Sequence, residues 1–337
     1  MNKMLPRPRF WTEAAKQNIR RRGPLRELLT YFLLIFLAYV FQALVISIPV
    51  TGWMMETQSD AMLEALNDGQ SVQGVILSAM EEMPDWVSVV SLLGGAGMGI
   101  AAIFYCLKFQ KRTLSSMGLG KQGLVADSLL GLVLGTALVA AVVALGVTVG
   151  GFRLVFPAGS PEKLGLLLLA FLGCLLYGAS LELLTRGYFA PTIGAYTPVA
   201  LALVVSTFVS AMMQAGGTLF SLPMANHLLL GAFLGIWVIK RGNLWGACAI
   251  HSAWLFAENF LFDIAPAGEH GGIRLLEVDA DPFRTALSGG LYGISNSICT
   301  TIILLLAVGA ALALRAKDPA PEEPEDAFDE EQHSNFL

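Results

Sequence analysis

Charged side chains are scarce in this 337-residue chain: Asp, Glu, Lys and Arg make up 14% of it, whereas hydrophobic residues make up 55%. Soluble domains carry about 25% charged residues, so an ordinary soluble enzyme or binding domain is excluded. Mean hydropathy is +0.64, and several apolar stretches reach the roughly 20 residues that a helix needs to cross a bilayer. The sequence therefore predicts an integral membrane protein.

Cysteine is also rare, and other common signals are missing. The four cysteines lie in or beside apolar runs without a CxxC pair, so we interpret them as small apolar residues rather than disulfides or zinc ligands. No basic patch is interleaved with aromatic residues, which argues against a nucleic-acid partner. The first apolar run begins near Leu28 and is too long for the hydrophobic region of a signal peptide, so we expect no cleavable signal.

Lys and Arg are unevenly distributed along the chain, and one long region contains neither. Residues 1–27 contain eight Lys and Arg residues, whereas residues 51–86 contain seven acidic residues and neither Lys nor Arg. Basic residues favour the cytoplasmic side of a membrane, so the first region is expected inside and the second outside. The expected spans are residues 28–50, 87–107, 124–149, 164–188, 199–218, 224–239, 244–264 and 285–314.

The predicted fold is therefore all-α: a polytopic membrane bundle of about eight transmembrane helices with both termini in the cytoplasm. We expect the last span to be broken at its glycines, and the acidic outer loop to form one or two short surface helices. Residues 318–337 include eight acidic residues and three prolines, a composition typical of disorder. The expected organisation is a basic tail (1–27), three spans with the outer loop 51–86 (28–159), a helical core (160–317) and an acidic tail (318–337).

Two charges stand at the end of the fourth apolar run. Glu182 and Arg186 are four residues apart, so on a helix they share a face and can pair. A charged side chain at the bilayer centre costs roughly 2.5–3.5 kcal/mol on insertion scales, so the pair needs an explanation. Spacing alone leaves two open: a structural ion pair, or a functional Glu182 held by Arg186.

Other polar residues also stand within the predicted spans. They are Gln214, His227, His251 and Glu258, of which the last two lie about two helical turns apart and share a face. His and Glu side chains in a bundle suit a metal or hydrolytic site and also a proton path. No HExxH signature is present, so residue types alone leave the function open.

Three motifs in this region resemble those of the CPBP intramembrane metalloprotease family, which includes CAAX prenyl endopeptidases and proteins of bacteriocin self-immunity. The family pattern is E-E-x-x-x-R, then F-x-x-x-H, then H-x-x-x-N or D. The first motif is Leu-Glu-Leu-Leu-Thr-Arg, ending at Arg186, and the third begins at His251 after an Arg-Gly-Asn-Leu-Trp turn. The resemblance covers about residues 160–314 and includes a glycine-rich entry to the last helix at 287–293.

The chain departs from the family pattern at several positions. Leu181 replaces the first Glu, Gln214 the middle His, Ser210 the Phe before it, and Leu255 the Asn. In the family, the first Glu and middle His are thought to activate the attacking water, and the last His and Asn to stabilise the oxyanion. Leucine cannot take a proton and glutamine has no useful pKa. The resemblance therefore leaves Glu182, Arg186 and His251 as the retained catalytic positions.

Three functions remain open. The first is a non-catalytic relative (a pseudoenzyme) that binds a membrane protein, a peptide or a lipid in the former substrate cavity. The second is an altered metallo-endopeptidase that cleaves a membrane-associated protein or peptide. The third is a transporter. In the peptidase, Glu182 is the base, His251 with His227 or Glu258 replaces the lost groups, and zinc is the expected metal. In each case we expect a bacterial cytoplasmic membrane as the location.

The span boundaries pose a geometric difficulty. With continuous spans, Glu182 falls near the inner face and Gln214 nearer the outer face, so the two residues could not meet. They can meet only if the helices end several residues from the expected positions, or are broken or tilted.

Overall fold

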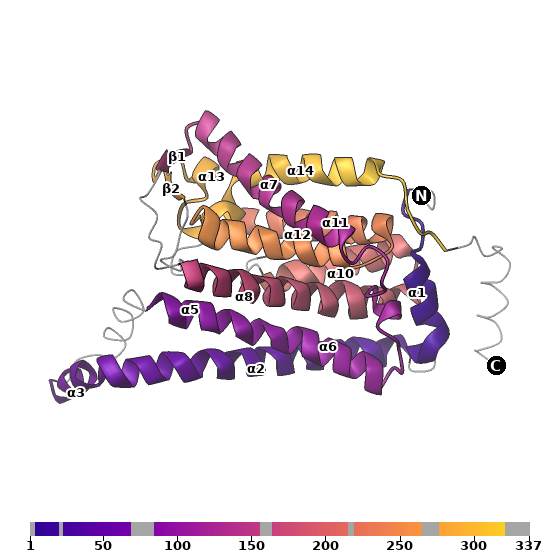
Figure 1. Cartoon of the computed structure of the whole chain (residues 1–337), viewed down its shortest axis with the longest axis horizontal. Helices are drawn as coiled ribbons and strands as arrows, with labels where there is room; N and C mark the ends of the chain where they lie inside the picture. Colours follow the sequence, from indigo (N-terminus) through magenta and orange to yellow (C-terminus); the bar gives the residue numbers. More distant parts are fainter. Residues whose placement is uncertain are drawn as a thin grey trace.

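The structure is a computed structural model that describes residues 4–19, 23–68, 84–155, 164–214, 219–264 and 276–320. Most of these residues are helical, and the long helices lie side by side in a bundle, with α2 at one edge and α14 at the other (Figure 1). The N-terminal helices are α1 (Arg9–Ala14), α2 (Pro24–Thr57), α3 (Ser59–Asn67), α5 (Asp85–Ser91), α6 (Ala96–Lys108) and α7 (Ala126–Thr148). The later helices are α8 (Leu164–Glu182), α9 (Ala190–Gly194), α10 (Val199–Gln214), α11 (Leu222–Arg241), α12 (Trp245–Phe256), α13 (Thr285–Ser288) and α14 (Ile298–Ala313).

Every stretch predicted to span the membrane contains helix in the described part of the chain. Among the described residues, four continuous helical segments are long and apolar enough to cross a bilayer: Pro24–Thr57, Ala126–Thr148, Leu164–Gly194 and Leu222–Arg241. Three further apolar helices are shorter: Leu92–Lys108, Val199–Gln214 and Ile298–Ala313. An all-α membrane bundle is thus supported, whereas the count of eight spans and the side of each terminus stay predictions.

The fourth span differs from its prediction, because its helix does not end near Tyr188. It passes from α8 through a π-helical turn, η5 (Leu183–Phe189), into α9 and ends at Gly194. Pro191 lies inside this continuous segment, and because it has no N–H, the Gly187 carbonyl accepts instead from Arg112 Nη2 at 2.9 Å. Glu182 therefore stands in the interior of a 31-residue helical segment.

This longer helix resolves the difficulty about depth. Glu182 lies 12 positions before Gly194, where the segment ends, and Ser210 lies 11 positions after Val199, where α10 begins. The two helices therefore return to the same level of the bundle. Of the alternatives left open, the structure has a displaced helix end: the segment ends at Gly194, six residues after the expected end, and Arg186 of this segment contacts Ser210 of α10.

The last span, the outer loop and the two terminal regions can also be compared with their predictions. The last span is broken as expected: α13 is followed by Gly289 at φ 84° and Gly293 at φ 61° before α14 begins. The outer loop contains one short helix, α3, as far as its described residues go, since 69–83 lie outside them. Within the basic N-terminal region, α1 buries Phe10 and Trp11 against the bundle. Most of the acidic tail (321–337) lies outside the described residues.

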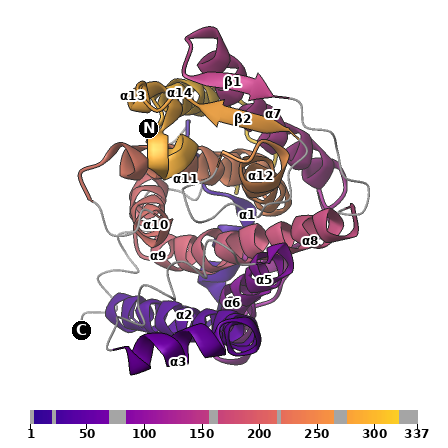
Figure 2. The same ribbon diagram turned by 90° about the vertical axis from the view of Figure 1, so that its left-hand side faces the viewer.

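The two ends of the bundle carry different small structures. At one end, β1 (Phe152–Val155) pairs antiparallel with β2 (Glu277–Ala280), and Figure 2 looks onto this end. At the other end, near α1, the N-terminal and C-terminal segments meet. There Arg9 Nε lies 3.2 Å from Asp318 Oδ1, and the backbone of Arg9 donates to the Asp318 carbonyl.

Helix α12 lies against α7 on one side and α8 on the other, and glycines allow the close approach. A Cβ atom at Gly135 of α7 would lie 2.3 Å from the Ile250 carbonyl oxygen. A Cβ atom at Gly178 of α8 would lie 2.6–2.8 Å from three atoms of Ser252. Small residues at such contacts bring membrane helices together, and this packing places the centre of α12, with His251, inside the bundle.

A glycine substitution on α8 tests this packing. We expect Gly178→Ala to lower the free energy of unfolding by about 1–3 kcal/mol, because the new methyl overlaps the backbone of Ser252. The measurement is thermal unfolding of the detergent-solubilised protein. Gly165→Ala on the same helix is the matched control, because nothing lies within 4 Å of its Cβ position. Equal stability of the two variants would contradict the packing argument.

Candidate functional site

The charged pair predicted from the sequence is formed. Arg186 Nη1 lies 3.0 Å from Glu182 Oε1, with Glu182 0% and Arg186 1% exposed. The pair joins the end of α8 to the π-helical turn η5. Both charged groups are thus buried, and they form an ion pair within one helical segment.

His251 of α12 completes this pair. Its Nδ1 atom lies 2.8 Å from the same Oε1 atom of Glu182, and its side chain is 1% exposed. Glu182 therefore holds two partners with one oxygen, one from its own helical segment and one from a helix more than 60 residues further along the chain. All three positions retained from the family pattern meet at one point.

Arg186 is tied to two more helices. Its Nη1 atom also donates to Thr185 Oγ1 at 2.8 Å and to Ser210 Oγ of α10 at 2.9 Å. Its Nη2 atom donates to the carbonyl of Gly231 on α11 at 3.0 Å. A side chain at Gly231 would meet this guanidinium, since its Cβ would lie 2.9 Å from Nη2. Arg186 thereby connects the helical segment of Glu182 to α10 and α11.

Gln214 also reaches this network, although indirectly. Its amide nitrogen donates to the Ser210 carbonyl at 3.1 Å and lies 3.4 Å from Ser210 Oγ, the hydroxyl that accepts from Arg186. Two positions at which the chain departs from the family, Ser210 and Gln214, are thus hydrogen-bonded to each other. Ser210 and Thr185 were not predicted as partners of Arg186: Thr185 is its neighbour in the sequence, and Ser210 comes from another helix.

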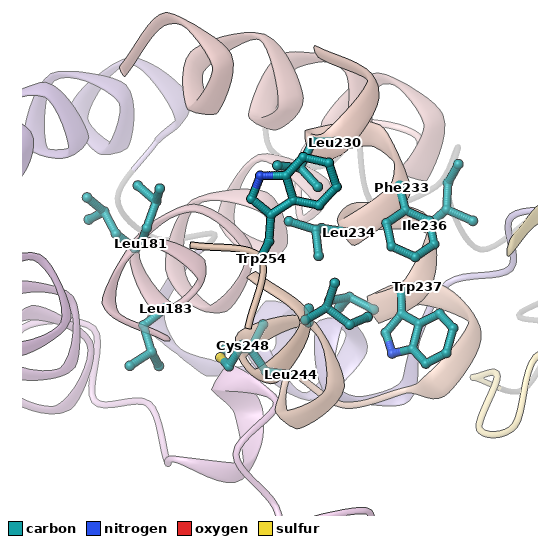
Figure 3. Close-up of a cluster of buried hydrophobic side chains, with 14 of the residues drawn as sticks. Leu181, Leu183, Leu230, Phe233, Leu234, Ile236, Trp237, Leu244, Cys248 and Trp254 are labelled. Atoms are coloured by element: carbon teal, nitrogen blue, oxygen red, sulfur yellow. The ribbon is translucent and has the colours of Figure 1, made fainter. Parts of the chain in front are cut away.

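The remaining predicted residues take other places. Leu181 is buried in the main hydrophobic cluster, among the side chains that Figure 3 draws. Leu255 packs with a separate cluster that includes Leu167 and Phe260. Glu258 accepts a hydrogen bond from Trp254 Nε1 at 3.0 Å, one turn away on its own helix. His227 is half-buried on α11, five residues after the helix begins.

Three polar atoms of the network have no hydrogen-bond partner among the residues that the structure describes: Glu182 Oε2, Arg186 Nε and His251 Nε2. Leaving a buried polar atom unpaired costs about 1–3 kcal/mol.

A zinc site requires at least three protein ligands, and within the described residues no three His, Cys, Asp or Glu side chains gather closely enough to provide them. With one carboxylate oxygen, one imidazole nitrogen and an adjacent guanidinium, this donor set does not fit zinc.

The role of Glu182 in stability can be measured directly. Glu182→Gln leaves the buried guanidinium of Arg186 without a charged partner, and breaking a buried pair costs about 3–5 kcal/mol. We therefore expect a large fall in the unfolding midpoint of the solubilised protein. Glu64→Gln, an exposed position on α3, is the control and should unfold like the parent. An unchanged midpoint for Glu182→Gln would rule out a structural role.

Comparison with known proteins adds one finding. Neither the curated proteins nor the solved structures contain a match to the chain. Residues 163–257 match a family model described as type II CAAX prenyl endopeptidase Rce1-like. The matched segment contains Glu182, Arg186 and His251, and it includes the four replaced positions as well. The resemblance drawn from the motifs is thereby confirmed over this segment: residues 163–257 are similar to the Rce1-like family.

Proposed function

We propose that this chain is a non-catalytic relative of the Rce1-like peptidases that binds a membrane-associated protein, peptide or lipid where the family handles its substrate. Its apolar helices and the family match support an integral membrane protein. The distribution of basic residues supports a cytoplasmic position for both termini in a bacterial inner membrane.

The observation that carries this proposal is the set of partners around the carboxylate of Glu182. Oε1 of this carboxylate is bonded to Arg186 and His251, so only Oε2, which has no hydrogen-bond partner among the described residues, is left to accept a proton. Leu181 and Gln214 stand where the family pattern has a second carboxylate and a histidine. Leucine and glutamine cannot exchange a proton at neutral pH. The retained residues therefore hold helices together, and the groups that would activate water are replaced.

One observation favours the alternative of an altered intramembrane peptidase. Glu182 Oε2 and His251 Nε2 are buried without a partner, and buried polar atoms of this kind are where ordered water binds. A water molecule held between a carboxylate and an imidazole could be activated for hydrolysis. This alternative needs Glu182 as the base and His251 as its partner, with no contribution from Glu258, which is bonded to Trp254.

A peptide assay separates the two functions. The purified protein is placed in lipid nanodiscs with a farnesylated peptide ending in a CAAX sequence that carries a photoreactive diazirine in its prenyl chain. We expect saturable cross-linking within residues 163–257 and no release of the terminal tripeptide. A photoreactive phospholipid, tested in parallel, tells whether the site prefers the peptide or the lipid.

Two outcomes would contradict the proposal. Release of the tripeptide by the parent but not by Glu182→Gln would establish the altered peptidase. The absence of saturable cross-linking with both probes would remove the binding role. The same peptide without its prenyl group is the control for non-specific labelling.

Metal content gives a separate test of the peptidase. We expect the protein, purified without chelators or metal-affinity resin, to contain well below one zinc per chain, with no change in His251→Ala. The donor set is the reason, since it offers too few ligands. Elemental analysis that finds about one zinc in the parent and none in His251→Ala would instead support a metal-dependent site.

A further inference from the structure

Exposed cations gather at one end of the bundle, where α2 begins and α6 ends. They are Arg26 on α2, Lys108 at the end of α6 and Lys111 in the segment that follows α6. All three residues are exposed, and among the residues that the structure describes none of their side chains forms an ion pair. All three also lie outside the segment that matches the Rce1-like family.

A buried contact holds the start of α2 against the end of α6. The hydroxyl of Tyr105 on α6 donates to the carboxylate of Glu27 on α2 at 3.2 Å, and Figure 1 shows the two helices side by side. Arg26 directly precedes Glu27, and Lys108 follows Tyr105 by three residues. Both cations therefore lie within about one helical turn of the same contact.

The two helical cations also lie toward the same seam between α2 and α6. Lys108 comes 11 residues, about three turns, after Gly97 and so shares its face of α6. A Cβ atom at Gly97 would lie 2.4 Å from the ring of Phe41 on α2, so this face of α6 is the one turned to α2. Arg26 stands within about 60° of Phe41 around the axis of α2. Arg26 and Lys108 thus flank one helix–helix contact.

Lys111 is held beside them in a rare backbone conformation. Its φ is 56°, in the left-handed region that is unfavourable for a residue with a Cβ atom. Both neighbours are fixed in the protein interior: Gln110 Nε2 donates to Glu27 at 2.7 Å, and Arg112 Nη2 donates to the Gly187 carbonyl at 2.9 Å. Backbone strain of this kind is concentrated at functional positions. The direction of Lys111 is therefore set by the fold.

Outward-facing apolar side chains lead to these cations along both helices. On α6, Ile100, Phe104 and Lys108 follow one another at intervals of four residues and form one row. Ile100 and Phe104 are exposed, as are Leu29 and Leu33 on α2. In a bilayer such side chains contact acyl chains, whereas Lys at the end of the row reaches the headgroup level. A row of this kind matches the order of acyl chain and phosphate in a phospholipid.

Two general effects do not account for the arrangement. The preference of Lys and Arg for the cytoplasmic side depends on their number near a span and does not require cations from three elements to converge. The C-terminal end of α6 favours Lys108, but the N-terminal end of α2 is partially positive and disfavours Arg26 in its first turn. An anion bound between the three cations would offset this repulsion.

We propose that the adjoining ends of α2 and α6 bind the phosphate of an anionic phospholipid through Arg26, Lys108 and Lys111, with an acyl chain along Ile100 and Phe104. Anionic lipids are attracted to basic residues beside membrane spans, and the exposed apolar row selects a lipid over a free anion. This site lies apart from the Glu182 network, so it goes beyond the proposed function and does not depend on it.

Thermal unfolding of the full chain in a neutral detergent tests the site. Phosphatidylglycerol should raise the unfolding midpoint of the parent saturably, by roughly 3–6 °C, because a bound lipid stabilises the folded state. Phosphatidylcholine and inorganic phosphate should leave the midpoint almost unchanged. The variant that combines Arg26→Gln, Lys108→Gln and Lys111→Gln should lose most of the rise.

The matched control removes three other exposed cations at the same end of the bundle that form no ion pair with the part of the chain described. It combines Lys16→Gln, Lys121→Gln and Arg315→Gln. This control should keep the full rise with phosphatidylglycerol. An equal rise in the two triple variants, or an equal rise of the parent with phosphatidylcholine, would overturn the inference. A rise with inorganic phosphate as large as that with the lipid would show a free-anion site and would overturn it as well.

Lys111→Gly provides a second variant that does not disturb the fold. Glycine adopts the left-handed conformation freely, so without lipid this variant should unfold no earlier than the parent. Its rise with phosphatidylglycerol should nevertheless be smaller, because one of the three cations is gone. A rise equal to that of the parent would contradict the role of Lys111. Cross-linking within residues 163–257 reports on the proposed function separately, since none of these substitutions lies in that segment.

Discussion

A charge inside an apolar bundle must be paired, and this constraint organises the centre of the molecule. Glu182 and Arg186 are both buried, and each hydrogen bond that Arg186 makes beyond Glu182 ends on a different part of the structure: Thr185, Ser210 and Gly231. His251 adds α12 through Glu182. Because an unpaired charge at this depth is expensive, the helices that supply partners are held in fixed register. One ion pair thereby connects four helical segments that hydrophobic packing alone would leave free to slide.

Close helix packing makes this arrangement possible. Glycines on α7 and α8 bring α12 near enough for His251 to reach Glu182, and Gly231 on α11 leaves its carbonyl open to Arg186. Apolar side chains fill the remaining space around the network, including Leu181 and Trp254 in the main hydrophobic cluster (Figure 3). The polar network and the packing depend on each other, since a shift of either helix would separate the charges.

Much of this could be predicted from the sequence, because the signals were local. Run length located the apolar helices, and the spacing of four residues predicted the pair of Glu182 with Arg186. Helix ends were harder, because Pro191 reads as a turn residue yet lies inside the continuous segment that ends at Gly194. The expected level of Glu182 relative to α10 depended on that one boundary. Single-sequence patterns also carry no signal for a π turn, since it changes the register of a helix by one residue without changing its composition.

Charge balance explains why the departures from the family pattern belong together. The pattern has two adjacent carboxylates and one arginine, which leaves an excess negative charge; neighbouring carboxylates raise each other's pKa and make one of them available for proton transfer. Here Leu181 removes one carboxylate, and the remaining one, Glu182, forms an ion pair with Arg186. Ser210, in the position of a phenylalanine, gives Arg186 an additional acceptor, and Gln214 bonds to Ser210 rather than presenting an imidazole. Leu181 and Gln214 thus each remove a group that could exchange a proton, and Ser210 adds an acceptor that holds Arg186 in place.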